Sequence, residues 1–312
     1  MPCGTVSVKP SRPFTASPEG RNPLGWMAMV PYSQYHGLGN AFLVLDCRTN
    51  DTSPGPEDAR IHCPTMGSSG VDGLLCIEEG RGGASFHMRV LNADGSEPEM
   101  CGNGIRCVVK HVVDQWGPQT APLAISTAAG IRQAQWVLGE DGKVESVSVS
   151  MGKPSRIPEE IPVQGASARI AIQLGEDSHE LECVSMGNPH AIRFGSSSRD
   201  LAERIGPPLS ASPVFPEGVN IGFARIETPT RIHLVVHERG CGVTEACGTG
   251  ACACVVAAVD DGRSPAGEDV SVILPGGILK IRVEKDRGDV WMTGPAVHVR
   301  DGHLSLAAET TN

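Results

Sequence analysis

The chain has 312 residues, 40% of them hydrophobic and 20% charged, and this length is too great for one comfortable core, so it predicts two domains. A formal net charge of −10 and few aromatic residues argue against a nucleic-acid partner, and the longest apolar runs are about half the roughly 20 residues that cross a membrane. An odd number of cysteines, 11, without a secretory leader favours a reduced, cytoplasmic protein with free thiols.

Residues 1–31 are rich in Pro, Ser, Gly and Arg and show no hydrophobic periodicity. We expect a disordered N-terminal extension. Two other interpretations stay open: a transit peptide, because basic residues outnumber the lone Glu19, and a true start at Met27 or Met29. Disorder and a misplaced start are the stronger interpretations.

Thirty-eight glycines and 24 prolines indicate many turns and short strands rather than long helices. Alternating or β-branched apolar segments predict strands at residues 42–45, 73–77, 86–92, 123–126, 144–150, 170–174, 180–186 and 232–237. Two segments predict helices, residues 105–116 and residues 251–259. Each helix directly follows a glycine-rich turn that contains a cysteine.

These two turns are copies of one pattern. The first reads EMCGNG over residues 99–104, and the second reads EACGTG over residues 245–250. After each helix a predicted strand leads to a Gly-Ile step, at residues 130–131 and 277–278. An internal duplication of this kind predicts two similar halves related by a pseudo-twofold axis. Cys101 and Cys247 would then face each other across a cleft, each at the start of its own helix.

A pair of thiols at two helix starts indicates acid/base chemistry. Unpaired N–H groups and a partial positive charge at a helix start bind anions and lower the pKa of a cysteine from about 8.5 towards neutrality. Two such ends could hold one carboxylate between them, so its α-carbon would lie between two sulfurs. One thiolate would remove the α-proton and the other thiol would protonate the opposite face. Preorganised N–H donors would replace an electron-sink cofactor such as pyridoxal phosphate.

Other interpretations of the same residues are weaker. Two buried structural cysteines would need no duplicated glycine-rich turn. Metal-binding and thiol-redox modules commonly contain two cysteines separated by two residues, C-x-x-C, and the sequence lacks this spacing. We therefore predict no metal ligands. Neither common nucleotide-binding glycine motif is present. Cys241, Cys252 and Cys254 are interpreted as small apolar fillers.

Two long motifs resemble the active-site signatures of the diaminopimelate epimerase family. The first runs from NADGS at residues 92–96 to CGNGIRC at residues 101–107, and the second is ERGCGVTEACGTGA at residues 238–251. Shorter matches are HGLGN at residues 36–40, MGNPH at residues 186–190 and VN at residues 219–220. The resemblance covers residues 35–304 in the right order.

The resemblance implies a cofactor-independent isomerase that converts LL-2,6-diaminopimelate to meso-diaminopimelate, in lysine and peptidoglycan precursor synthesis. It implies Cys101 and Cys247 as the acid/base pair. The substrate-binding residues that it implies are Asn40, Asn92, Gly102, Asn103, Asn188, Asn220, Glu238, Arg239, Gly248 and Thr249. Glu238 and Arg239 suit the non-reacting amino-acid centre, because arginine can hold a carboxylate with two hydrogen bonds.

The implied fold class is α+β, with two pseudo-twofold-related lobes, each a mixed, strongly curved β-sheet wrapped around a central helix. The N-terminal lobe would span residues 32–150 and be completed by a C-terminal strand near residues 295–306, and the C-terminal lobe would span residues 151–294. A homodimer is a further expectation. Some family members carry a substrate-contacting amide where Gly73 stands. His190 is expected to be structural or to support a residue that contacts the substrate, because the expected chemistry needs no imidazole. The nearest alternative is a two-thiol racemase of proline, hydroxyproline or histidine.

Overall fold

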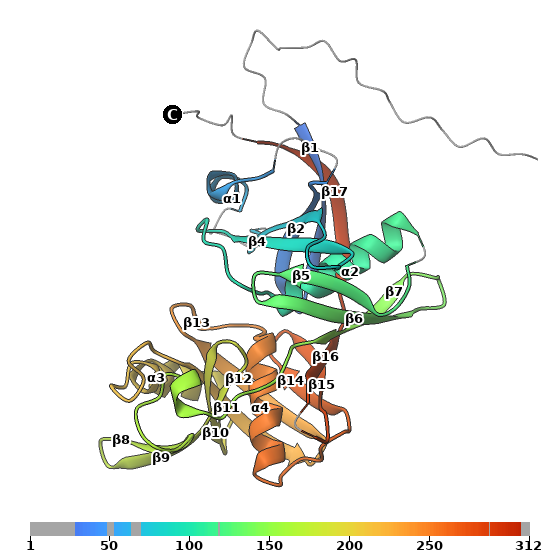
Figure 1. Cartoon of the computed structure of the whole chain (residues 1–312). Coiled ribbons are helices and arrows are strands. Elements are labelled where there is room, and N and C mark those ends of the chain that lie inside the picture. The colour runs from blue at the N-terminus through green and yellow to red at the C-terminus, as the bar shows by residue number, and fades with distance from the viewer. Residues whose placement is uncertain (1–28, 49–52, 64–69, 118, 287, 307–312) are drawn as a thin grey trace, which may run out of the picture.

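The computed structural model describes residues 29–48, 53–63, 70–117, 119–286 and 288–306. Over these residues the chain is a mixed α+β protein of two lobes, which lie one above the other in Figure 1. This arrangement confirms the predicted fold class. Within the described residues no helix is both long enough and apolar enough to cross a membrane.

The N-terminal lobe combines the first seven strands with the last one. Its strands are β1 (Met29–Gly37), β2 (Asn40–Asp46), β3 (Gly73–Glu79), β4 (Phe86–Asn92), β5 (Leu123–Thr127), β6 (Gly130–Leu138), β7 (Val144–Ser150) and β17 (Val297–Ser305). Its helices are α1 (Pro56–His62) and α2 (Gly102–Trp116). The strand β17 pairs antiparallel with β1, so the two ends of the described chain lie side by side.

The C-terminal lobe is continuous in sequence. Its strands are β8 (Arg169–Leu174), β9 (Asp177–Ser185), β10 (Pro189–Phe194), β11 (Asn220–Thr228), β12 (Arg231–Glu238), β13 (Gly242–Val243), β14 (Val270–Leu274), β15 (Gly277–Val283) and β16 (Val290–Gly294). Its helices are α3 (Arg199–Ser210), α4 (Gly248–Asp260) and a short 3₁₀ turn at Pro158–Glu160.

The same order of strand directions is repeated in both lobes. In the first, β2 is parallel to β3, β3 antiparallel to β4, β4 parallel to β5, and β5, β6 and β7 are antiparallel in turn. In the second, β10, β11, β12, β14, β15 and β16 follow the same sequence of directions. An outer helix follows β2 and β10, and a central helix follows β4 and β12. The duplicated turns therefore mark a duplication of the whole lobe.

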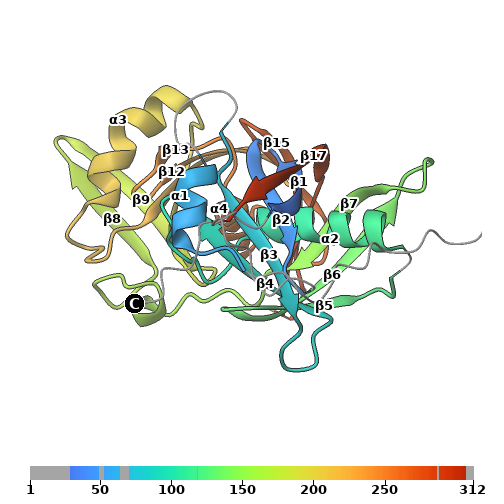
Figure 2. The same cartoon turned by 90° about the horizontal axis from the view of Figure 1, so that it is seen from above.

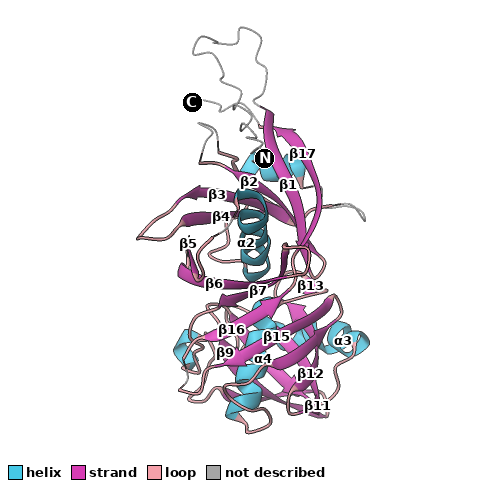
Figure 3. Ribbon diagram, turned by 90° about the vertical axis from the view of Figure 1, so that its right-hand side faces the viewer, coloured by secondary structure: helices cyan, strands magenta, loops and turns pink. Residues whose placement is uncertain are grey.

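The equivalent strands β7 and β16 pair with each other and join the two lobes. Their antiparallel pairing makes one continuous sheet of 17 strands among the described residues. Since the paired strands are equivalent, the pseudo-twofold axis passes between them. In Figure 3, α2 and α4 lie on opposite sides of this junction, each enclosed by the strands of its own lobe.

The main hydrophobic core follows the two central helices. The helix α4 is apolar almost all round, and its residues from Gly250 to Ala258 are buried, as expected for a helix enclosed by a sheet. One cluster of buried side chains includes residues of both α2 and α4. Two smaller clusters lie on the outer faces, under α1 and under α3. In Figure 2 α1 and α3 lie on the left of the view and α2 on the right, while Figure 1 places α1 in the upper lobe and α3 in the lower lobe.

Several boundaries differ from the expectations. The strand β1 begins at Met29, so residues 29–31 belong to the sheet rather than to a disordered extension, and the remaining 1–28 lie outside the described residues. Both central helices begin three residues earlier than predicted, at the glycine after each cysteine. The outer helices were missed. The seven residues of α1 are too few to show a helical periodicity, and two prolines lie inside α3.

Candidate active site

The two predicted cysteines occupy the same position in the two lobes. Cys101 is the N-cap of α2, with φ −137° and ψ 103°, and Cys247 is the N-cap of α4, with φ −115° and ψ 104°. The Sγ of Cys101 accepts a hydrogen bond from the Gly104 N–H at 3.3 Å. The thiol therefore takes the place that a Ser or Asp side chain fills in an ordinary N-cap.

The second glycine of each turn makes room for the thiol. A Cβ at Gly104 would lie 3.3 Å from Cys101 Sγ and 2.9 Å from a methyl group of Leu75. A Cβ at Gly250 would lie 3.1 Å from Cys247 Sγ. The repeated Cys-Gly-x-Gly pattern thus has a steric cause in both lobes.

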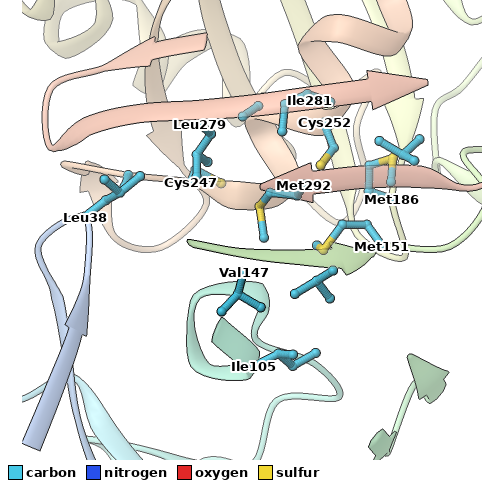
Figure 4. Close-up of a cluster of buried hydrophobic side chains, with 14 of the residues drawn as sticks. Leu38, Ile105, Val147, Met151, Met186, Cys247, Cys252, Leu279, Ile281 and Met292 are labelled. Atoms are coloured by element: carbon cyan, nitrogen blue, oxygen red, sulfur yellow. The ribbon is translucent and has the colours of Figure 1, made fainter. Parts of the chain in front are cut away.

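The two helix starts approach each other across the lobe junction. A Cβ at Gly248, on α4, would lie 3.5 Å from the Asn103 Oδ1 of α2. This Oδ1 is buried and has no hydrogen-bond partner within the described structure, while the Asn103 Nδ2 donates to Asn40 Oδ1 at 2.6 Å. Figure 4 shows Cys247 and Ile105, one from each helix, on either side of the junction.

Burial dominates the acidity of both thiols. It raises the pKa of Cys101, although the Gly104 N–H and the charge of Arg106 lower it. Burial raises the pKa of Cys247 well above its ordinary value, and the negative charge of Glu238 raises it further. The expectation that helix starts bring both pKa values towards neutrality is therefore wrong for this structure, because desolvation outweighs the backbone donors.

The raised pKa values predict slow, pH-dependent alkylation. Only the thiolate is a good nucleophile, and its fraction rises about tenfold per pH unit below the pKa, so iodoacetamide should react slowly at neutral pH and ever faster above it. Cys101 is partly exposed and Cys247 is 5% exposed, so Cys101 should react first. Peptide mass mapping measures both rates, with fully buried Cys252 and Cys254 as unreactive controls. A rate that is already maximal at neutral pH would contradict this assignment.

The predicted binding residues are also arranged in equivalent pairs. Strand register pairs Asn40 with Asn188, Gly73 with Asn220, and Asn92 with Glu238. The N-cap position pairs Cys101 with Cys247. The first three pairs lie at or next to the ends of their strands, and the two cysteines lie at the helix starts. Sequence positions far apart are thereby gathered at equivalent places around the two helix starts.

In the N-terminal lobe, Asn92 belongs to a tight polar turn. Its Nδ2 donates to the Ser96 Oγ at 2.9 Å, and its N–H donates to the Ser96 carbonyl. Gly73 lies directly opposite Asn92 on β3, and a Cβ there would clash with the Leu91 carbonyl. Gly73 therefore has a packing reason to be glycine.

In the C-terminal lobe, Asn188 and Thr249 link the site to Cys247. The Asn188 Nδ2 donates to Thr249 Oγ1 at 3.4 Å, and this hydroxyl lies 3.7 Å from Cys247 Sγ. The Nε2 of His190 contacts the Asn188 Oδ1 at 3.0 Å. Burial, and then the charge of Arg239, lowers the pKa of His190 to about 3, so this imidazole is neutral and orients Asn188.

The side chains of Glu238 and Arg239 lie in different surroundings. The Glu238 carboxylate accepts from Thr244 Oγ1 at 2.5 Å and acts electrostatically on Cys247. The exposed Arg239 donates from Nη1 to the Glu217 carbonyl at 2.7 Å, and its N–H donates to Asn220 Oδ1 at 2.9 Å. Glu238 is therefore close to the paired thiols, whereas the guanidinium of Arg239 is held at the loop of Glu217.

One charged side chain near the site was not predicted. Arg106, on α2, is fully buried and donates from Nε to the Pro295 carbonyl at 3.2 Å. Its Nη1 lies 3.6 Å from Met292 Sδ, and its Nη2 has no hydrogen-bond partner within the described structure. The signal in the sequence was an arginine inside an otherwise apolar stretch of helix. The structure contains no group of three or more metal-ligating side chains within the described residues.

Two similar lobes, each a curved sheet around a central helix, define a fold that solved racemases and epimerases share. A probable proline racemase from Agrobacterium radiobacter K84 has this fold, with a TM-score of 0.66 and 14% identity over 90% of this chain and 94% of that one. A hydroxyproline epimerase from Agrobacterium vitis gives 0.66 and 17% over 92% and 94%.

Sequence comparison gives the family. The family model of diaminopimelate epimerase matches residues 32–157 and 182–299. The diaminopimelate epimerase of Synechococcus elongatus is 41% identical over 89% of this chain and 99% of its own length. That of Desulfitobacterium hafniense is 43% identical over 86% and 96%. The chain belongs to the diaminopimelate epimerase family and is an isomerase of the epimerase type.

Proposed function

We propose that this enzyme converts LL-2,6-diaminopimelate to meso-diaminopimelate with Cys101 and Cys247 as its acid/base pair and without a cofactor. The observation that carries the proposal is the matched pair of N-cap cysteines on two helices whose starts face each other. An epimerisation is nearly symmetric about one carbon, so two equivalent groups on opposite sides suit both directions of the reaction.

The reacting carboxylate would bind between the helix starts. Backbone N–H groups of Gly102, Asn103, Gly248 and Thr249 would hold it, because the first N–H groups of a helix have no partner within the helix. One thiolate then removes the α-proton, and the negative charge passes onto the carboxylate, where these donors stabilise it. The other thiol protonates the carbon from the opposite face, and the two cysteines exchange protonation states.

The polar residues around the helix starts support a substrate with two amino-acid centres. Glu238 offers a carboxylate to an ammonium group, and Asn188 and Asn220 offer amide groups that donate and accept. Arg239 would bind the distal carboxylate after leaving the Glu217 carbonyl. Proline, hydroxyproline and histidine lack a second amino-acid centre, so they offer Glu238 and Arg239 no partner on the substrate.

The same proposal places the enzyme in the cytoplasm, in the synthesis of lysine and of peptidoglycan precursors. It includes a homodimer as the assembly to be tested, for which size-exclusion chromatography with light scattering is the direct measurement. The relatives named above carry the diaminopimelate epimerase name, which supports the substrate assigned here.

We expect LL-diaminopimelate to be epimerised in deuterated water with one deuterium incorporated at the inverted α-carbon. The incoming proton comes from a thiol that exchanges with solvent, so the product should carry the solvent isotope. Chiral chromatography with mass spectrometry measures both inversion and incorporation. Proline and histidine serve as controls and should not turn over. Inversion with the original hydrogen retained, or faster turnover of either control, would overturn the proposal.

A further inference from the structure

Met292 lies beside the pseudo-twofold axis between the lobes. It lies on β16, directly opposite Val149 of β7. Val149 pairs with Ala134, the fifth residue of β6. Met292 pairs with Ile281, the fifth residue of the equivalent strand β15. Met292 and Val149 are therefore equivalent residues of the two lobes, and the axis passes between them. A long side chain on one lobe faces a short one on the other.

The thioether of Met292 touches the start of both central helices. A Cβ at Gly248, the first residue of α4, would lie 2.9 Å from Met292 Sδ. A Cβ at Gly102, the first residue of α2, would lie 2.7 Å from Met292 Cε. At Gly102 the Met151 side chain is also close, with its Cε 3.0 Å and its Sδ 3.2 Å from the same Cβ position. Met292 therefore crowds the glycine after the cysteine in both turns, and Met151 adds to the crowding at Gly102.

The position of this side chain is fixed from several directions. Met292 is 0% exposed, and the Nη1 of the buried Arg106 lies 3.6 Å from its Sδ. The Nε of Arg106 bonds the carbonyl of Pro295, just beyond β16, which ties α2 to this strand. Figure 4 shows Met292 between Cys247 and Met151. A methionine is flexible by itself, but here its neighbours leave it little freedom.

We propose that Met292 is a positioning residue that acts as a spacer between the two helix starts and so sets the gap between the Cys101 and Cys247 thiols. The spacing follows from van der Waals contact on both sides of one side chain. Its catalytic consequence rests on the proposed function, because proton transfer to and from one carbon requires both sulfurs within reach of it. A misplacement of about 1 Å can cost about 10²-fold in rate.

A double-mutant cycle on stability tests the spacer without any assay of activity. Gly248→Ala should lower the melting temperature because its Cβ meets Met292, and Met292→Ala should lower it by leaving a cavity. In the double variant the methyl group added at position 248 enters that cavity. We therefore expect the double variant to lose several degrees less than the sum of the two single losses.

The control cycle uses the next glycine of the same helix. A Cβ at Gly250 would meet Cys247 Sγ and a Val236 methyl group, both at 3.1 Å, and neither belongs to Met292. The losses of Gly250→Ala and Met292→Ala should therefore add. Additive losses in the Gly248 cycle as well would overturn the proposed contact.

Kinetics test the catalytic consequence. Met292→Ala should lower kcat by between about tenfold and about 10²-fold and change KM by a smaller factor, because the thiols and the first helical N–H groups shift while Glu238, Asn188 and Asn220 keep their places. Met88→Ala, at a buried methionine of β4, is the control for loss of a core side chain and should keep kcat near wild type at a temperature where it is folded. A folded Met292→Ala enzyme with wild-type kcat would overturn the role of the spacer. A wild-type enzyme without activity on diaminopimelate would instead defeat the proposed function, and the stability cycle would still decide the spacing.

Discussion

Replacing either Cys101 or Cys247 with alanine is expected to lower the rate of epimerisation by about 10²-fold to about 10⁴-fold. This is the contribution of a positioned general acid or base, and each thiol serves as one of the two in every turnover. The fold should remain, because each change removes one sulfur atom. At Cys101 the cap hydrogen bond from the Gly104 N–H is lost too, and loss of a helix cap costs about 1 kcal/mol, whereas the Cys247 side chain makes no cap hydrogen bond. Steady-state assay in both directions, with thermal unfolding of each variant, measures the two effects separately.

Matched controls exist on the same two helices. Cys107 lies on α2 and Cys252 on α4, both fully buried, and burial raises the pKa of each to about 12. Replacing either with alanine removes a buried thiol from the same helix, but one that does not lie at the helix start. These variants should retain kcat within about twofold once they are shown to be folded. Comparable losses in all four variants would indicate a packing effect and contradict the acid/base assignment.

Isotope exchange sharpens the same prediction. A variant with one thiol can still remove the α-proton from that side and return a solvent deuteron to the same face. Cys101→Ala and Cys247→Ala should therefore each exchange the α-hydrogen of one isomer, LL or meso, and the two variants should differ in which isomer exchanges. Equal exchange of both isomers by either variant would mean that a third group acts as a base.

The duplication made the fold predictable from the sequence, and the exceptions have local causes. Two cysteine turns at matching offsets from a helix and a Gly-Ile step indicated two similar lobes, and the repeated strand directions bear this out. The helix α3 escaped prediction because Pro207 and Pro208 lie inside it, where prolines usually end a helix. The start of β1 escaped because its pairing partner is β17, at the far end of the chain.

The site was predictable in its residues but less so in its electrostatics. A motif places a cysteine at a helix start, yet the acidity of its thiol depends on burial by strands from elsewhere in the chain. The contact of Arg106 with Met292 joins residues 186 positions apart, and no local pattern in the sequence signals it. Such contacts across the lobe junction are decided by tertiary packing, so they become visible only in the folded protein.

Replacing Glu238 with glutamine is expected to lower kcat/KM by between about tenfold and about 10³-fold, because truncating one partner of a charge pair between enzyme and substrate costs several kcal/mol. A second effect acts on the free enzyme. The Glu238 carboxylate raises the pKa of Cys247, so removing its charge should lower that pKa. The thiolate of Cys247 then forms at lower pH, and its alkylation profile should shift to lower pH while that of Cys101 stays in place.

The matched control is Glu245→Gln, two residues before Cys247. The Glu245 side chain is exposed and bonds Arg199 at 2.5 Å, so this variant removes a charge close in sequence that does not face the thiols. Its kinetics and both alkylation profiles should remain within about twofold of wild type. If Glu238→Gln shifts the Cys247 profile but leaves kcat/KM unchanged, Glu238 tunes the thiol without binding substrate. If it changes neither, the carboxylate has no part in the site, because a charge that acts on Cys247 cannot be removed without a change in the acidity of that thiol.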